Sequence, residues 1–288
     1  MRILVDNYVS DKTTEPVYLD RCFKIAGATS HLWDRRQVSL YDMFDQFSPE
    51  VFVTDYKRIT PELAKYLSGS RKPIDIVLNV TGAANQQLEA ILSFLQNCGS
   101  KSPFCFTNVP SAVGYDAQGK LKVESIMHGA DIFLPSHSHL DYQIDTAVLA
   151  VGGLDPANPD YAVRGSYHII NCGATEDYKF DAKIPIHQGP SIYRNYNKLV
   201  VFGTPDKVFC QTFFDAALHA NDFSVWAKDK ADADMCHKVM EDLRMNNVDS
   251  RVPVLRSHTA LHRAKRFLSK LKCKELSANL DKAIGELV

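Results

Sequence analysis

The sequence lacks the glycines and short signatures that mark the commonest nucleotide and hydrolase sites. No glycine follows the first apolar run, which continues as VDNYVSDKT over residues 5–13, so a GxGxxG dinucleotide site is excluded at that turn. The chain also has no GxxxxGK[ST] phosphate loop, no GxSxG nucleophile elbow and no HExxH zinc motif. The usual NAD, P-loop ATPase, serine hydrolase and zinc protease classes are therefore excluded.

The sequence also has little that indicates disulfides, structural zinc or a membrane span. Its seven cysteines form no CxxC pair, so we expect free thiols in a reducing compartment. No apolar run approaches the roughly 18 residues that a membrane helix needs. The N-terminal MRILVDNY enters a strand-like run without a signal-peptide core, so the predicted location is cytoplasmic. A formal net charge of −1 argues against a protein that coats nucleic acid.

Short apolar runs alternate with amphipathic segments, which is the pattern of a parallel sheet with crossover helices. Helical spacing appears at 40–47, at 85–99 and at 60–67, where Thr60 suits an N-cap and Pro61 the first helical position. One doubly wound, Rossmann-like acceptor domain is predicted over residues 1–152. Its six predicted strands are residues 2–8, 30–35, 50–56, 74–80, 103–109 and 130–136.

A turn-rich segment, GGLDPANPD at 152–160, predicts a hinge before a second α/β domain over 164–250. We expect residues 251–288 to form C-terminal helices that pack back across the cleft. The predicted fold class is α/β, with two Rossmann-like domains facing a central cleft and ligands at the carboxyl ends of the strands. The second domain is expected to have strands at 165–173, 198–203 and 222–229, and helices near 187–197, 208–220 and 231–246.

One helix of the second domain carries a carboxylate within an apolar run, VFCQTFFDAALH at 208–219. The N–H groups at its start favour an anion, and Gln211 and Thr212 can donate further hydrogen bonds. Asp215 falls about one turn later on the same face and can accept from hydroxyl groups. The alternative is an ordinary helix carboxylate that caps or pairs at the surface. The flanking Phe and Ala residues should be buried, which favours the binding site.

This helix resembles the acidic helix of the CgeB-like family of GT-B glycosyltransferases, in FFDAAL at 213–218 and in the strand that follows. A second segment, SHTALHRAKRFL at 257–268, is similar to the HTxxxRA segment of that family and contains His258 and Arg263. Two positions depart from the family pattern. The acidic position is usually Glu and is Asp215 here, and Asn221 stands near the place of a glycine.

The resemblance implies a GT-B fold and a nucleotide diphosphate sugar, in particular a UDP-sugar, as donor substrate, with no permanently bound cofactor. It implies that the helix holds the diphosphate and that Asp215 holds the ribose. It also implies that His258 and Arg263 serve the donor site or the domain hinge. In this layout the loop CGATED at 172–177 places Gly173 at the cleft.

The segment GPSIYRNYNK at 189–198 carries two further candidates for the donor. Gly189 permits close backbone approach, and the fork of Arg194 suits a phosphate. Phage DNA glucosyltransferases are similar in kind, because they place arginines in a comparable region. The alternative is an exposed helical arginine.

The catalytic base is expected at the carboxyl end of a strand in the first domain. Asp55 follows the third predicted strand and is preferred to Asp6, which lies in the first. The cluster SHSHLD, with His137, His139 and Asp141, is a further candidate. No metal is predicted, because GT-B enzymes generally offset the leaving diphosphate with a helix dipole and basic residues.

The segment 250–274 contains eight Lys and Arg residues and no acidic residue. It favours contact with phosphates of the donor or of a DNA acceptor; the alternative is a solvated helix face. The sequence thus predicts a hexosyl- or pentosyltransferase, with a hydroxymethylated or glycosylated pyrimidine in phage DNA as candidate acceptor. The alternatives are transfer to a surface glycan or protein, a nucleotide-sugar epimerase or hydrolase, and a non-catalytic nucleotide-binding module.

Overall fold

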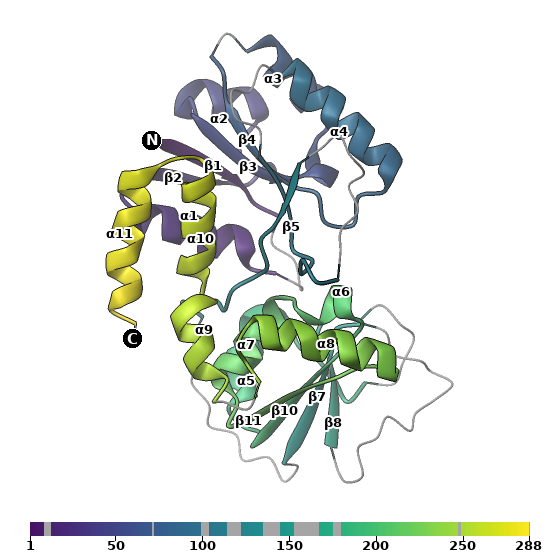
Figure 1. Ribbon diagram of the computed structural model, residues 1–288. Coiled ribbons are helices and arrows are strands. Elements are labelled where there is room, and N and C mark those ends of the chain that lie inside the picture. Colours follow the sequence, from purple (N-terminus) through teal and green to yellow (C-terminus); the bar gives the residue numbers. More distant parts are fainter. Residues whose placement is uncertain are drawn as a thin grey trace.

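Two parallel sheets with flanking helices make up the computed structural model of this chain (Figure 1). The described residues are 1–8, 13–70, 72–98, 104–113, 122–134, 145–152, 167–174, 180–246 and 249–287. The predicted fold class, two α/β domains with C-terminal helices, is confirmed.

The first sheet has six parallel strands in the order β2-β1-β3-β4-β5-β6. Its central strands are buried along nearly their whole length, as expected for a parallel sheet with both faces covered. The predicted strand at 130–136 differs, because Ala130 forms only an isolated bridge with Thr259. The strands are β1 (Arg2–Asp6), β2 (Thr29–Trp33), β3 (Val51–Asp55), β4 (Asp75–Asn79), β5 (Phe104–Thr107) and β6 (Val123–Ser125).

The helices of the first domain begin largely where the sequence places their caps. Thr60 accepts a hydrogen bond from the Leu63 N–H at 3.2 Å, and Ser39 accepts one from Asp42 in the same way. One helix, α1, has no counterpart in the sequence prediction. The elements are α1 (Glu15–Ile25), α2 (Leu40–Phe47), η1 (Tyr56–Arg58), α3 (Pro61–Gly69) and α4 (Asn85–Asn97).

The second sheet has five parallel strands in the order β11-β10-β7-β8-β9. Its middle strand, β7, lies inside the range expected for the first domain, yet it pairs with β8 and β10. The structure therefore places the sheet boundary before residue 146. The strands are β7 (Thr146–Ala150), β8 (Tyr167–Asn171), β9 (Ala182–Lys183), β10 (Lys198–Phe202) and β11 (Asp222–Trp226).

The helices of the second domain are shorter than the sequence indicates. The helix expected at 187–197 is a 3-10 turn followed by α5, and the one expected at 208–220 is divided into α6 and α7. Helix α7 lies in the core of this domain, with Phe213 and Phe214 fully buried. The elements are η2 (Ile186–Gln188), α5 (Gly189–Tyr193), α6 (Pro205–Val208), α7 (Gln211–His219), α8 (Lys230–Asp242) and α9 (Arg251–Ser257).

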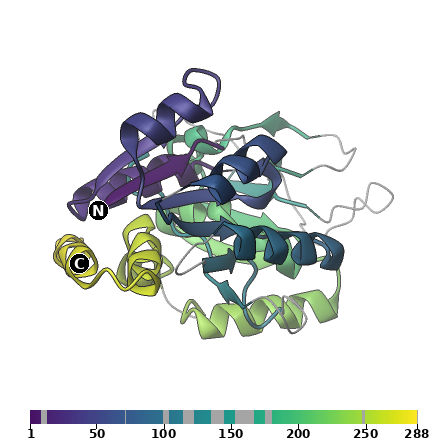
Figure 2. The same cartoon turned by 90° about the horizontal axis from the view of Figure 1, so that it is seen from above.

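The last two helices return to the first domain. Helices α10 (Ala260–Lys270) and α11 (Lys274–Gly285) pack beside α1 (Figure 1). Figure 2 shows these two helices, in yellow, on the side of the molecule where the N-terminus lies. The Phe267 ring of α10 lies 4.8 Å from the Phe106 ring of β5, measured between centroids. The C-terminal helices therefore complete the core of the domain in which the chain begins.

The chain passes between the domains at two adjacent segments. The N–H of Ala130 donates to the carbonyl of His258, and the N–H of Ala260 donates to the carbonyl of Ala130, both at 2.8 Å. A Cβ on Gly129 would lie 2.5 Å from the carbonyl oxygen of Thr259, so only glycine permits this approach. We call these two hydrogen-bonded segments, residues 129–130 and 258–260, the paired strap.

Candidate functional site

A cavity of about 430 Å³ lies where the carboxyl ends of the two sheets meet. Each sheet changes crossover direction here, between β1 and β3 in the first and between β7 and β10 in the second. Such switch points are where open α/β sheets bind ligands. The first domain contributes Lys57, Thr81, Gly82, Asn108 and His128, and the second contributes Val151, Cys172, Gly173, Asp206, Lys207, Phe209 and Cys210.

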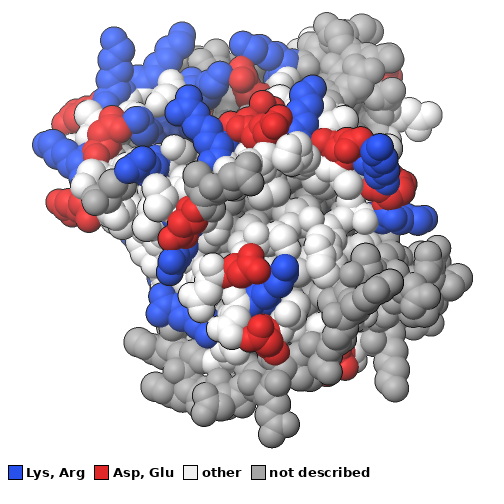
Figure 3. All heavy atoms as spheres, turned by 60° about the horizontal axis from the view of Figure 1, so that its bottom comes forward, with Lys and Arg blue, Asp and Glu red and all other residues white. Residues whose placement is uncertain are grey.

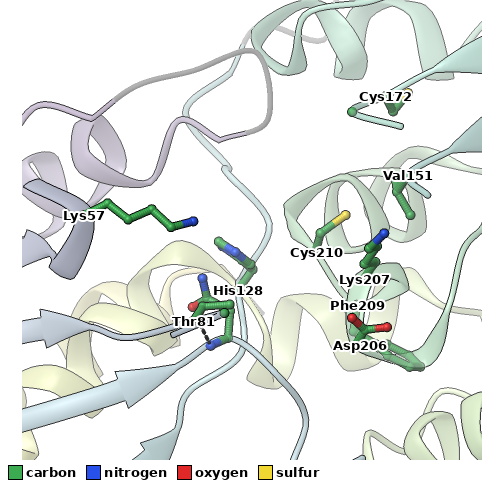
Figure 4. Close-up of a pocket in the computed structure, with 12 residues that line it drawn as sticks. Lys57, Thr81, His128, Val151, Cys172, Asp206, Lys207, Phe209 and Cys210 are labelled. Carbon is green, nitrogen blue, oxygen red and sulfur yellow. Dashed lines mark hydrogen bonds between the residues drawn. The ribbon is translucent and has the colours of Figure 1, made fainter. Parts of the chain in front are cut away.

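The first domain contributes Lys57 of η1 to the cavity wall. Asp55, the preferred candidate base, lies two residues earlier at the end of β3 and is not among the residues that line the cavity. The Asp55 carboxylate accepts a hydrogen bond from the Lys57 N–H at 2.9 Å, which caps η1. Burial raises the pKa of Asp55 above the ordinary aspartate value. Lys57 is exposed, and its side chain extends toward His128 across the cavity (Figure 4).

His128 lies at the junction of the two domains and lines the cavity (Figure 4). Burial, with a further contribution from the positive charge of Arg263, lowers the pKa of His128 to about 4. The imidazole is therefore neutral at neutral pH. Its Nδ1 is buried and has no hydrogen-bond partner among the described residues, so this ring can accept a proton.

Lys207 faces the cavity from the second domain (Figure 4). Its side chain runs along Gly152, where a Cβ would lie only 2.7 Å from the Lys207 Cδ atom. Lys57 and Lys207 thus bring positive charge from opposite domains, against one lining carboxylate, Asp206. This arrangement favours a ligand with negative charge near the domain boundary.

The cavity reaches the start of α7 at its N-cap residue Cys210. Gln211 and Thr212 follow in the first turn, but both are buried, with exposed fractions of 0% and 2%. Asp215 lies one turn further along the helix and is also fully buried. The start of α7 thus lies beside the cavity, whereas the three predicted side chains lie behind the cavity surface.

Gln211 and Asp215 join the two domains through hydrogen bonds. The Gln211 amide donates to Asp215 at 3.2 Å and to the Thr14 hydroxyl at 2.8 Å, and its oxygen accepts from the Thr14 N–H at 2.9 Å. Asp215 accepts from the Asp131 N–H at 2.7 Å, and the Asp131 carboxylate accepts from the Thr14 hydroxyl at 2.6 Å. We call these four residues the interdomain network.

Among the described residues, the hydrogen-bond donors to the two carboxylates of this network are backbone N–H groups, a hydroxyl and an amide rather than cations. Burial, and then the neighbouring charge of Asp131, hold the pKa of Asp215 well above the ordinary value. Burial likewise raises the pKa of Asp131. The network is therefore most stable when it carries little negative charge.

Arg263 is one layer behind the cavity, buried in the first domain. Its guanidinium forms an ion pair with Glu15 of α1 and donates to Asn108 Oδ1 at 2.7 Å. It also donates to the carbonyls of Ile126 and Met127. The predicted Arg263 thus fixes Asn108, which lines the cavity, and the segment that leads to His128.

The predicted His258 lies at the paired strap, where its carbonyl accepts from Ala130. Its ring packs on Phe214 with centroids 5.6 Å apart. Burial lowers the pKa of His258 to about 4. The residue contacts the interface between the domains and does not line the cavity.

The three candidates on the loops of the second domain occupy different places. Gly173 lines the cavity with a φ of 114°, which glycine adopts without strain. A Cβ on Gly189 would lie 2.6 Å from the ring of Tyr193, so this glycine makes room for an aromatic side chain. Arg194 is exposed and lies 3.4 Å from the Nδ1 of His219, at the end of α7 remote from Cys210.

Asp6, the second candidate base, is fully buried at the end of β1. Its two oxygens accept from the guanidinium groups of Arg35 and Arg58, and Oδ2 also accepts from the Thr54 hydroxyl at 2.6 Å. The acceptor positions of this carboxylate are thus occupied by protein donors.

The His137, His139 and Asp141 cluster lies outside the described residues. Within the ranges described, no group of three or more His, Cys, Asp or Glu side chains is placed to hold a metal ion. The helices in those ranges include none with the length and apolar character of a membrane span.

The structure divides the basic segment at 250–274. Arg263 is buried, and Arg251, Lys265 and Lys270 form ion pairs with Asp249, Asp281 and Glu124. On the face shown in Figure 3, Lys and Arg side chains alternate with Asp and Glu. Four of the eight positive side chains of this segment, counting the buried Arg263, thus form ion pairs.

Sequence reasoning missed Lys57, His128 and Lys207 as cavity residues. Lys57 follows the predicted base Asp55 by two positions, and Lys207 follows the turn TPD. Both positions lie at the carboxyl ends of predicted strands, which is a usable signal. His128 follows no predicted strand, because β6 itself was not predicted.

The chain matches no family model and no curated protein sequence. Two solved structures align with nearly its whole length. The calicheamicin glycosyltransferase CalG4 has a TM-score of 0.39 and 11% identity, covering 94% of this chain and 98% of that one. The glycosyltransferase SnogD from Streptomyces nogalater has a TM-score of 0.40 and 12% identity, covering 100% of this chain and 98% of that one.

Proposed function

We propose that this protein transfers a sugar from a nucleotide diphosphate sugar, in particular a UDP-sugar, to a hydroxyl group. The observation that carries the proposal is the cavity between the two switch points, with Lys57 and Lys207 on opposite walls. A diphosphate leaving group develops negative charge during transfer. Two lysines on opposite walls can stabilise that charge without a metal ion.

The reaction joins the acceptor oxygen to the anomeric carbon of the sugar as the bond from that carbon to the diphosphate breaks. In an inverting transfer, the acceptor hydroxyl must lose its proton to a nearby base. His128 supports this role through its neutral ring and its unpartnered Nδ1. Asp55 is the second candidate, because its pKa is raised and it adjoins Lys57.

The bound nucleotide would lie at the start of α7, near Cys210 and Gly173. We propose that the N–H groups in the first turn of this nine-residue helix donate hydrogen bonds to the diphosphate. Asp215 then acts through the interdomain network rather than by touching the ribose. A modified DNA base remains our candidate acceptor, although the ion pairs of the basic segment weaken that part of the proposal.

A thermal-shift panel of UDP, GDP, ADP and their sugars tests the donor site. A ligand at 100 times its dissociation constant adds about 2.7 kcal/mol to the free energy of unfolding, so one nucleotide should raise the midpoint. Lys207→Ala should weaken that nucleotide about tenfold, because a hydrogen bond to a charged group contributes roughly 1.5–3 kcal/mol. Arg194→Ala is the matched control and should bind as the wild type does.

The base is tested separately by transfer or donor hydrolysis with the nucleotide that binds. His128→Gln should lower kcat at least 100-fold, in the range typical for a general base, and leave the nucleotide affinity unchanged. If no nucleotide shifts the midpoint, or if Arg194→Ala weakens binding as much as Lys207→Ala, the donor site is misplaced. Binding without any turnover would indicate a nucleotide-binding module.

A further inference from the structure

A pair of arginines stands beside the cavity at the carboxyl ends of β1, β2 and β3. Arg35 contacts Asp6 through Nε at 3.0 Å and Nη2 at 2.6 Å. Arg58 contacts the same carboxylate through Nε at 2.9 Å and Nη2 at 3.1 Å. One buried anion thus holds two guanidinium groups side by side.

The two arginines are fixed in position before any ligand arrives. Arg35 also donates to the carbonyl of Arg58 at 2.6 Å, and its guanidinium lies 4.8 Å from the ring of Trp33. Arg58 belongs to η1, the 3-10 turn that also carries Lys57. A fixed guanidinium loses little conformational entropy when it binds an anion.

The charge of this cluster is not balanced. Two guanidinium groups share one carboxylate, whose exposed fraction is 0%, while the Arg35 and Arg58 side chains are 20% and 32% exposed. One arginine would suffice to neutralise Asp6. The second adds a positive charge to η1, which also carries the cavity residue Lys57 and is capped by the Asp55 carboxylate. Three cations, Arg35, Arg58 and Lys57, thus stand against two carboxylates, Asp6 and Asp55.

We propose that Arg35 and Arg58 bind a phosphate group of the acceptor. Each guanidinium has N–H groups beyond those that contact Asp6, and a phosphate has enough oxygens to accept from two forks. The carboxylate beneath sets their spacing, and the phosphate binds on the open side. The assignment of this phosphate to the acceptor rests on the proposed function, whereas the anion site itself does not.

In this proposal the first domain selects acceptors that carry a phosphate group. An acceptor whose phosphate is held at Arg58 would place its remaining groups toward Lys57 and His128. A sugar phosphate and a nucleic-acid backbone offer the same group, so both sources fit the chemistry. Acceptors without phosphate would lose this anchor.

The direct test is titration calorimetry with inorganic phosphate on the full chain, with the donor cavity filled by the nucleotide found above. If no nucleotide binds, the titration is made on the free protein. Wild type should bind phosphate, and more tightly than acetate. Arg58→Gln should weaken phosphate about tenfold or more, because a hydrogen bond to a charged group contributes roughly 1.5–3 kcal/mol. Arg58→Lys keeps the positive charge but not the guanidinium fork, so its phosphate affinity should lie between those of the wild type and Arg58→Gln.

Arg36→Gln is the matched control, since Arg36 lies in the same loop as Arg35, is 86% exposed and pairs with Asp34 rather than with Asp6. It should bind phosphate as the wild type does. The proposal is overturned if wild type binds no phosphate, if acetate binds as tightly, or if Arg58→Gln and Arg36→Gln behave alike. Competition by a sugar phosphate and by a short oligonucleotide then identifies the source.

The two proposals fail in different ways. Phosphate binding with no nucleotide binding would leave the anion site and remove the glycosyltransferase assignment. Nucleotide binding without phosphate binding would keep the proposed donor site and remove the anion site. Because Asp6 keeps Arg35 in Arg58→Gln, this variant should fold, and its unfolding midpoint without ligand verifies that.

Discussion

Asp6 and Asp215 are both fully buried carboxylates, one in each domain, and their surroundings are opposite. Asp6 receives two guanidinium groups and a hydroxyl. Asp215 receives one backbone N–H and one amide, with a second carboxylate, Asp131, nearby. Asp6 thus pairs with two cations and holds them in position, whereas burial favours the protonated form of Asp215.

The difference shows what each carboxylate contributes to a cleft between domains. A charged anchor such as Asp6 fixes side chains that reach outward to ligands. A hydrogen-bonded carboxylate such as Asp215 fixes one domain against the other, because its partners Asp131 and Gln211 connect to Thr14 of the first domain. Three variants measure that difference, beginning with the largest effect.

Asp6→Ala should lower the free energy of unfolding by about 3 kcal/mol. Removing one partner of a buried ion pair typically costs 3–5 kcal/mol, and the partial exposure of both arginines puts this site at the lower end. Urea denaturation measures the change. Asp34→Ala, which removes the partner of the exposed Arg36, should leave the midpoint unchanged. If Asp6→Ala and Asp34→Ala lowered the free energy of unfolding equally, Asp6 would not stabilise the fold more than an exposed ion pair does.

Gln211→Ala should lower the free energy of unfolding by roughly 1–3 kcal/mol, because it leaves the buried Thr14 N–H without a partner and removes one of the two hydrogen bonds to the Asp215 carboxylate. Gln188, exposed on η2, offers the control Gln188→Ala, with no expected change. The same urea series measures both. A Gln211→Ala midpoint equal to that of the wild type would show that water replaces the network at no cost.

Asp215→Asn tests the protonated state through the pH dependence of stability, and its effect should be the smallest. The folded pKa of Asp215 is raised, so the folded state keeps a proton that the unfolded state releases. Wild-type stability is therefore full below the unfolded pKa of 3.8 and falls as pH rises through the folded pKa.

The Asn variant has no such proton, so its free energy of unfolding should fall less between pH 4 and pH 8. Urea denaturation across that range measures both proteins. Asp131, whose pKa is also raised, contributes the same direction of change to both. Parallel curves for wild type and variant would show that Asp215 is ionised in the folded protein.

The sequence predicted those strands and helices that are indicated by a pattern within their own residues. The runs that became β1, β3, β4 and β10 are apolar along their length, and α3 carries its own cap in Thr60 and Pro61. Strand β7 was missed although TAVLA at 146–150 is equally apolar. Its membership of the second sheet depends on pairing with β10, about fifty residues later, which no local pattern reports.

The predicted site residues are only partly brought together by the structure. The N-cap residue of α7, Cys210, and Lys57, two residues after β3, line the cavity, and both follow elements that local patterns predict. The partners of Asp215, Arg263 and Asp6 lie 84, 248 and up to 52 residues away along the chain. Whether a carboxylate meets an arginine or another acid is fixed by such distant contacts, so local sequence could not distinguish the two environments.

The return of α10 and α11 to the first domain sets an order for folding during synthesis. The ion pair between Glu15 and Arg263 and the contact of Phe106 with Phe267 join the earliest and latest parts of the chain. The second domain, made in between, has its own complete sheet and core before those helices leave the ribosome. The domain whose synthesis starts first is therefore the one whose folding is completed last.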